Sequence, residues 1–249
     1  NPEGVFWEVY HEDMDFKSYV FGTLHKADPR VLDLPANVQA ALESADVVAV
    51  EIESADDPSA VGAVIGKSPQ LILQPQGESL ADDLSSETVA AVDAYLNELG
   101  MDFDMLAPLQ PWIGASSLSF TKCDMEWGGP TAQVLDARLI ELAKSKDIPD
   151  VSLETIESQL EAISSINEQM FIRSIEDVAR LYEEGIYDAV LKTMNELYLK
   201  EQIGMIIPVQ LHYTSQYEGR DDDWAEFQEA LLDARNELMV ENAGQLMDK

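Results

Sequence analysis

A histidine and two glutamates stand where side chains could carry out chemistry. His25 closes the segment Ser18–His25, and Glu51 and Glu53 close the apolar run that begins at Val47. The carboxyl ends of strands are where ligands bind in an α/β sheet. A neutral imidazole can bind a metal ion or act as a base, and a carboxylate beside apolar residues is costly to bury unless it is paired or metal-bound. Together these residues predict a His/carboxylate cluster.

Each of these residues also has a purely structural interpretation. Spacing alone favours a structural role for His25 at a strand end. Glu51 and Glu53 point to the same face of a strand, yet both could be solvated where the strand meets a loop. Glu154 follows a second short apolar run, and it could equally begin the next helix. Gly22, three residues before His25, would allow a ligand to approach closely.

Strands and one helix must position these side chains. Alternating residues predict a hairpin from strands Val5–Tyr10 and Tyr19–Leu24. A helix is expected over Pro35–Leu42, followed by a strand over Val47–Ile52 that is buried on both faces. This order predicts a right-handed βαβ unit, so we expect His25 and Glu51 on adjacent parallel strands, with their side chains in one cleft.

Beyond Asp56 the pattern is mainly helical. The fold class predicted is therefore α/β (α+β), with a small mixed sheet from the N-terminal hairpin and the βαβ unit, covered by a large helical portion. A short strand is expected over Val151–Leu153. Helical periodicity predicts helices over residues 85–99, 111–120, 131–146, 155–163, 167–183, 186–200 and 223–246.

Charge and cysteine content exclude several classes of function. The 249 residues contain 48 acidic and 15 basic side chains, and the formal charge of −33 disfavours binding to nucleic acid or to anionic membranes. Cys123 is the only cysteine, so an intrachain disulfide and cysteine-based zinc motifs are excluded. No apolar stretch is long enough to cross a bilayer, so a membrane tether could lie only outside this chain.

Five blocks of the sequence resemble, in the correct order, the TraB/GumN/Tiki family. They run from about Phe6 to Asn242 and suggest one domain over residues 1–249. Tyr19–His25 resembles the family's GxxH block, and Val47–Glu53 resembles its acidic-ended second strand. The other similar blocks are Leu109–Trp112, a helix with Asp136, Leu139 and Ala143 followed by Leu153–Thr155 and Gln159, and the pair Arg235-Asn236.

The resemblance implies a secreted, periplasmic or cell-surface metal-dependent hydrolase, specifically a peptidase, that acts on a peptide or protein. Carried over by position, His25 is the first histidine of the site, Glu51 its acidic residue and Arg235 its arginine. His25 and Glu51 would hold a divalent ion, Mn²⁺ or Co²⁺, and Arg235 would stabilise the oxyanion. Glu53 and Glu154 are further candidates. Without the resemblance, Arg235 would be interpreted as a surface arginine paired with a neighbouring acid.

The second GxxH motif of the family does not occur in these 249 residues. We therefore expect the natural chain to continue beyond Lys249 with the missing C-terminal strand or strands. Since one ligand is lost, we also expect weak metal binding and low activity from residues 1–249. The alternatives are a metal-free, esterase-like hydrolase with His25 as base, a haem- or ligand-binding protein, and an inactive homologue that binds proteins. The sequence does not determine the oligomeric state.

Overall fold

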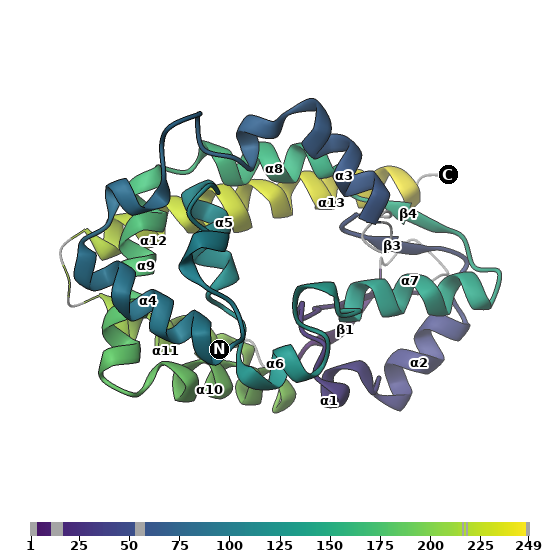
Figure 1. Cartoon of the computed structure of the whole chain (residues 1–249). Helices are drawn as coiled ribbons and strands as arrows, with labels where there is room; N and C mark the ends of the chain where they lie inside the picture. Colours follow the sequence, from purple (N-terminus) through teal and green to yellow (C-terminus); the bar gives the residue numbers. More distant parts are fainter. Residues whose placement is uncertain (1–3, 11–16, 53–57, 216, 218, 248–249) are drawn as a thin grey trace.

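The computed structural model describes residues 4–10, 17–52, 58–215, 217 and 219–247. Helices make up 64% of it and strands 8%, which confirms the α+β class. The elements follow one another around an open centre of the ribbon, with the strands, α1, α2 and α7 on one side and α4, α5 and α9–α12 on the other (Figure 1). None of the described helices is long and apolar enough to cross a membrane.

The described strands form two separate two-stranded sheets instead of one mixed sheet. β1 (Phe6–Tyr10) and β2 (Lys17–Phe21) form the expected antiparallel hairpin. β3 (Val48–Val50) pairs in parallel with β4 (Asp150–Ser152), not with β2. The predicted βαβ unit and the predicted adjacency of the His25 and Glu51 strands are therefore wrong. Periodicity identifies a strand, but it does not identify the partner of that strand.

β3 is buried on one face only. Val50 is buried, whereas Val47 is 41% exposed, so the expected burial on both faces is also wrong. α7 (Leu135–Ser145) packs against β3 and β4 and covers them. β4 follows α7 after a short connection, so the packing of α7 against β3 also places β4 beside β3. Most residues of the hairpin are exposed, and Tyr10 is 74% exposed.

A small apolar core joins the hairpin to the first helices. α1 (Pro29–Leu32) and α2 (Ala36–Glu43) pack with α7 around this core. Asp28 caps α1 by accepting a hydrogen bond from the Arg30 backbone N–H, and its fully buried carboxylate also binds the Arg30 guanidinium. The buried apolar residues of this core are Val5, Val31, Leu34, Val38, Leu42, Leu135, Leu139 and Tyr198.

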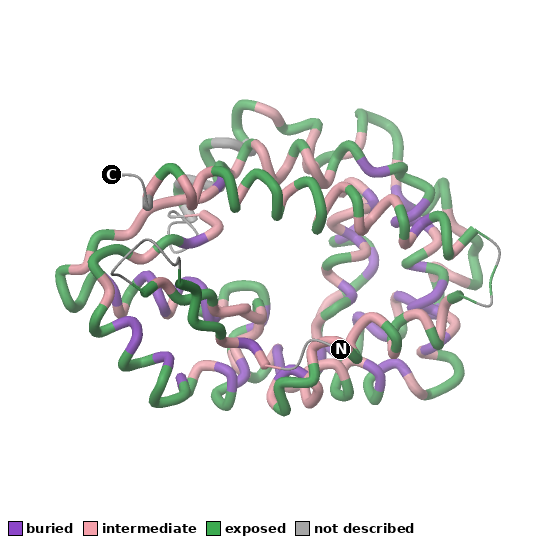
Figure 2. The backbone as a smooth tube through the Cα atoms, turned by 180° about the vertical axis from the view of Figure 1, so that it is seen from behind, coloured by how far each residue is buried: buried purple, intermediate pink, exposed green. Residues whose placement is uncertain are grey.

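The larger core lies on the other side of the ring. α4 (Ser86–Glu98) begins at the expected serine cap, where the Ser85 side chain accepts a hydrogen bond from the Thr88 N–H. α4 and α5 (Pro111–Ser117) both pack against α9 (Glu168–Glu183). A Cβ at Gly114 would lie 2.8 Å from the Leu80 side chain, so glycine allows this close approach. Figure 2 shows buried segments along these helices.

The remaining elements complete the ring. Four helices are α3 (Pro58–Lys67), α6 (Lys122–Glu126), α8 (Ile156–Ser165) and α10 (Tyr187–Leu199), and α11 (Ile206–Thr214) follows α10. Short 3₁₀ turns are η1 (Pro69–Leu71), η2 (Leu80–Asp83), η3 (Phe103–Met105), η4 (Gly129–Thr131) and η5 (Ile203–Met205).

The C-terminal helix contains an irregular turn. α12 (Arg220–Gln228) continues through η6, a π-helical turn over Glu229–Asp233, into α13 (Ala234–Met247). At its start, Arg220 Nε donates to Asp177 Oδ2 of α9 at 2.9 Å, and Arg173 of α9 pairs with Asp223. The π-turn holds one residue more than a regular turn, so it changes which residues of α13 face the sheet.

Candidate functional site

His25 lies four residues beyond the end of β2 and is held by Asp136. Its Nδ1 lies 2.8 Å from Asp136 Oδ2, and the Thr23 hydroxyl donates to Asp136 Oδ1 at 2.9 Å. Asp136 sits in the first turn of α7. The His25 side chain is 64% exposed, whereas that of Asp136 is only 11% exposed. The buried carboxylate therefore fixes one ring nitrogen, and the other remains accessible.

The hydrogen bond sets the ionisation of both residues. The bond to Asp136 raises the pKa of His25 above its ordinary value, although desolvation acts in the opposite direction. For Asp136, burial favours the neutral form, but the bonds from His25 and Thr23 outweigh it and lower the pKa. The neutral imidazole thus carries its proton on Nδ1, where the carboxylate accepts it, and presents the Nε2 lone pair outward.

A second cluster forms where the two parallel strands end. β3 and β4 are in register, with Val50 opposite Ser152. The ladder continues beyond them, because the Glu154 N–H donates to the Glu51 carbonyl at 2.9 Å. The carboxyl ends of parallel strands meet at one edge of the sheet. Glu51 and Glu154 therefore lie side by side, although they are far apart in the sequence.

Arg235 of α13 binds both glutamates. Its Nε and Nη2 donate to the two carboxylate oxygens of Glu154 at 3.0 and 2.8 Å, and Nη2 also donates to Glu51 Oε2 at 2.8 Å. The Glu154 side chain is 1% exposed, that of Arg235 19% and that of Glu51 36%. Arg235 is therefore not a surface arginine paired with a neighbouring acid. Glu154 likewise does not simply begin the next helix.

Two amides tie the neighbouring helices to the same edge. Gln159 of α8 donates to Glu51 Oε2 at 3.2 Å, and Asn242 of α13 donates to the Leu153 carbonyl at 2.8 Å. Thr155 caps α8, so Glu154 stands outside that helix. Glu51 is consequently fixed through one oxygen, Oε2, while Oε1 has no hydrogen-bond partner among the described residues.

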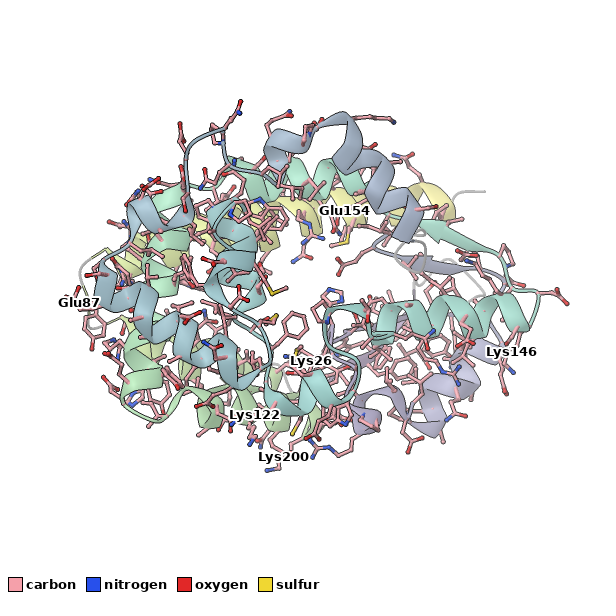
Figure 3. All side chains as sticks on the ribbon, in the orientation of Figure 1. Lys26, Glu87, Lys122, Lys146, Glu154 and Lys200 are labelled. Atoms are coloured by element: carbon pink, nitrogen blue, oxygen red, sulfur yellow. The ribbon has the colours of Figure 1, made fainter. Side chains whose placement is uncertain are left out.

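The two clusters interact through their charges. The negative charge of Glu51 raises the pKa of His25, and the positive charge of Arg235 lowers it, so both lie within electrostatic reach of the imidazole. In Figure 3, Glu154 lies beside α13 toward the open centre of the ring, with Lys26, the neighbour of His25, on the other side of that centre. The contacts thus form two groups, His25 with Asp136 and Thr23, and Arg235 with Glu51 and Glu154, which interact through their charges.

One candidate, Gly22, does not add to this site, and a second, Glu53, is not described. A Cβ at Gly22 would make only ordinary contacts, 3.8 Å from the Val5 carbonyl and 3.9 Å from the Trp7 ring, so close approach does not require glycine there. Its carbonyl instead accepts a hydrogen bond from the Tyr198 hydroxyl at 2.8 Å. Glu53 lies outside the described residues.

Asp136 is the site residue that residue-type reasoning missed. The sequence indicates it only as part of a helical block that resembles a family pattern. A usable signal was present, since an acidic side chain in the first turn of an otherwise apolar helix face needs a partner when it is buried. Its partner is His25, 111 residues earlier.

The donor atoms fit a divalent ion only in part. His25 Nε2 and Glu51 Oε1 are the accessible acceptors, whereas Asp136 and Glu154 are already bound to His25 and Arg235. Within the described part of the chain, no group of three or more His, Cys, Asp or Glu side chains could hold a metal ion. A catalytic divalent site commonly uses about three protein ligands, so this set is one short.

Comparison with known protein families matches residues 5–249 to the TraB/PrgY/gumN family. The chain belongs to this family. No curated protein and no solved structure matches it. Most of the blocks that resemble the TraB/PrgY/gumN pattern contribute a residue to one of the two clusters, through His25, Glu51, Asp136, Glu154 and Arg235. The remaining block lies elsewhere, since Trp112 Nε1 donates to the Leu71 carbonyl at 2.8 Å.

Proposed function

We propose that the protein is a hydrolase in which His25 activates water for attack on a peptide bond. One observation supports this most strongly, namely that Asp136 binds Nδ1 of an imidazole whose side chain is 64% exposed. A carboxylate in this position selects the tautomer and stabilises the imidazolium that forms on proton transfer. Peptide substrates and a location outside the cytoplasm are proposed from the family resemblance.

The proposed reaction needs two proton transfers at one nitrogen. Neutral His25 accepts a proton from water at Nε2 as the water oxygen attacks the carbonyl carbon. The same proton then passes to the leaving amine nitrogen as the carbon–nitrogen bond breaks, which returns His25 to its neutral form. Asp136 stays ionised throughout, and Thr23 holds its second oxygen in place.

Arg235 serves this reaction mainly as a positioning residue. All but one of its N–H groups are already committed to Glu154, Glu51 and the Leu231 carbonyl. Little donor capacity remains for an oxyanion. Its bonds to two carboxylates instead fix the direction of the Glu51 side chain.

A divalent ion is compatible with the same residues. His25 Nε2 and Glu51 Oε1 would hold it, with Glu53 as a candidate for the missing ligand, and the resemblance favours Mn²⁺ or Co²⁺. Such an ion would act as a Lewis acid and lower the pKa of bound water. Asp136 would then orient a ligand histidine, as carboxylates commonly do. The incomplete ligand set favours the metal-free form, in which His25 alone is the base.

Peptide turnover by the 249-residue chain tests the proposal. His25→Ala should lower kcat/KM at least about 100-fold, and Asp136→Asn should lower it about 10- to 100-fold. His212→Ala is the matched control, because His212 is an exposed histidine on α11 and should leave turnover unchanged.

Exhaustive chelation distinguishes the metal-free mechanism, with His25 as base, from the metal-dependent mechanism. Turnover that survives exhaustive chelation selects the histidine base, and turnover that is lost and then restored by Mn²⁺ or Co²⁺ selects the ion. Absence of turnover under every condition, or equal activity of His25→Ala and the parent chain, would overturn the proposal. Stable haem or protein binding without turnover would then favour a non-enzymatic role.

A further inference from the structure

We infer that the site selects peptides that carry a cationic side chain or amino group next to the bond to be cleaved, with Glu51 as the residue that binds it. The inference rests on the proposed peptidase function and names its substrate class. It follows from the uncommitted atoms of the site and from its formal charge.

The site carries more negative than positive charge in every protonation state of His25. Three carboxylates, those of Glu51, Glu154 and Asp136, face one arginine and one histidine. When His25 is neutral, as a base must be, the imbalance is larger. A substrate carboxylate or phosphate placed here would be repelled, and a cationic group would be attracted.

The nearby positive groups are already engaged. Arg235 spends almost all of its N–H groups on Glu154, Glu51 and Leu231. Lys26, next to His25 in the chain, donates to Asp124 Oδ2 and to the Ser119 carbonyl, both at 2.9 Å, and its side chain is only 22% exposed. Binding an anionic group would therefore require one of these pairs to break.

Glu51 offers the complementary acceptor. Its Oε2 is held by Arg235 and Gln159, which fixes the direction of the carboxylate, and its Oε1 has no partner among the described residues. The side chain is 36% exposed, so a ligand can reach it. An ammonium or guanidinium group can donate a charge-assisted hydrogen bond to such an oxygen. Glu51 would thus place the cationic group beside the His25 imidazole.

Binding of matched peptides tests this inference. Three peptides share one central sequence flanked by arginine, glutamine or glutamate, and their central peptide bonds are N-methylated to prevent cleavage. Fluorescence anisotropy measures binding to the full chain in the presence of a chelator, so that no metal ion bridges the peptide. At low salt the basic peptide should bind at least about tenfold more tightly than the acidic peptide, with a smaller ratio at high salt.

Two isosteric variants test whether the binding preference comes from Glu51 or from the acidic surface as a whole. Glu51→Gln and Glu87→Gln change the net charge equally, but Glu87 lies on α4 at the far edge of the molecule (Figure 3). Glu51→Gln should reduce the basic-to-glutamine affinity ratio several-fold, and Glu87→Gln should leave it unchanged.

The outcomes distinguish this inference from the proposed function. Equal binding of the basic and acidic peptides, or equal effects of the two variants, would overturn the inference. Cleavable versions of the peptides complete the test. Cleavage without charge preference would overturn the inference and leave the hydrolase intact, whereas Glu51-dependent binding without any cleavage would support Glu51 as the cation-binding residue and contradict the hydrolase.

Discussion

Arg235 and Glu154 are joined by two parallel hydrogen bonds, Nε to Oε2 at 3.0 Å and Nη2 to Oε1 at 2.8 Å. This pair ties the C-terminal helix to the end of β4. Glu154 is almost completely buried, so its carboxylate depends on Arg235 for compensation. The same guanidinium also orients Glu51. Arg235 therefore contributes both to the stability of the fold and to the candidate site.

Replacing Arg235 should therefore destabilise the fold. Arg235→Ala leaves the buried Glu154 carboxylate without its charged partner and should lower the free energy of unfolding by about 3 kcal/mol. Arg138→Ala is the control, because Arg138 pairs with Glu141 on the surface, and the expected loss is below about 1 kcal/mol. Urea denaturation measures both. Equal losses of unfolding free energy in the two variants would show that the buried pair stabilises the fold no more than the surface pair does.

Removing the carboxylate beside His25 should lower the pKa of that histidine. Asp136 is the main cause of the raised value, so Asp136→Asn should return the pKa of His25 toward its ordinary range. The chain has three histidines, and NMR titration with His25→Gln as the assignment control follows each one. The base must be neutral, so the rising limb of the pH profile should also move to lower pH. An unchanged His25 titration would contradict the geometry.

The same pair predicts how stability depends on pH. The folded-state pKa of His25 is raised, so its contribution is present below the unfolded value of about 6.5 and is lost as pH rises through the folded value. The pKa of Asp136 is lowered, so its contribution is present above about 3.9 and is lost as pH falls through the folded value. The stability difference between the parent chain and Asp136→Asn should therefore peak between about pH 4 and 6.5. A difference that increases above neutral pH would refute this assignment.

Salt should stabilise the protein. Forty-eight acidic side chains cannot all pair with fifteen basic ones, and their mutual repulsion is screened by added ions. A gain of about 1 kcal/mol would raise Tm by about 3 °C. Thermal unfolding in dilute and in molar sodium chloride measures the effect, with sucrose as an uncharged control. A Tm that does not depend on salt would indicate that the acidic surface is too dispersed to matter.

Local patterns predicted most of the long helices. Ser85 and the periodicity after it located α4, and the helices predicted over 167–183 and 186–200 correspond to α9 (Glu168–Glu183) and α10 (Tyr187–Leu199). α11 was not predicted, because Ile206–Thr214 contains a proline and a nearly continuous apolar run that gives little helical periodicity. The π-turn was also missed, since one additional residue hardly disturbs an amphipathic pattern.

The pairing of the strands and the partners of the charged residues depended on long-range contacts. Val47–Ile52 was recognised as a strand, but its partner β4 lies about a hundred residues later, and no local signal encodes that choice. Residue type and position at strand ends indicate His25 and Glu51, the family resemblance adds Arg235, and neither assigns Asp136 to the site. A buried carboxylate and its partner can be matched only when the fold brings them together.

The residues of the Glu51–Glu154–Arg235 cluster lie far apart in the sequence, and this separation affects how the nascent chain folds on the ribosome. Arg235 follows Glu154 by 81 residues. While the ribosome translates that interval, β3 and β4 can already pair, but the Glu154 carboxylate has no guanidinium to accept a hydrogen bond from. Nascent chains that have not released α13 from the exit tunnel should therefore keep this edge of the sheet hydrated and open. The Glu51–Glu154–Arg235 cluster should therefore form only after α13 has left the exit tunnel.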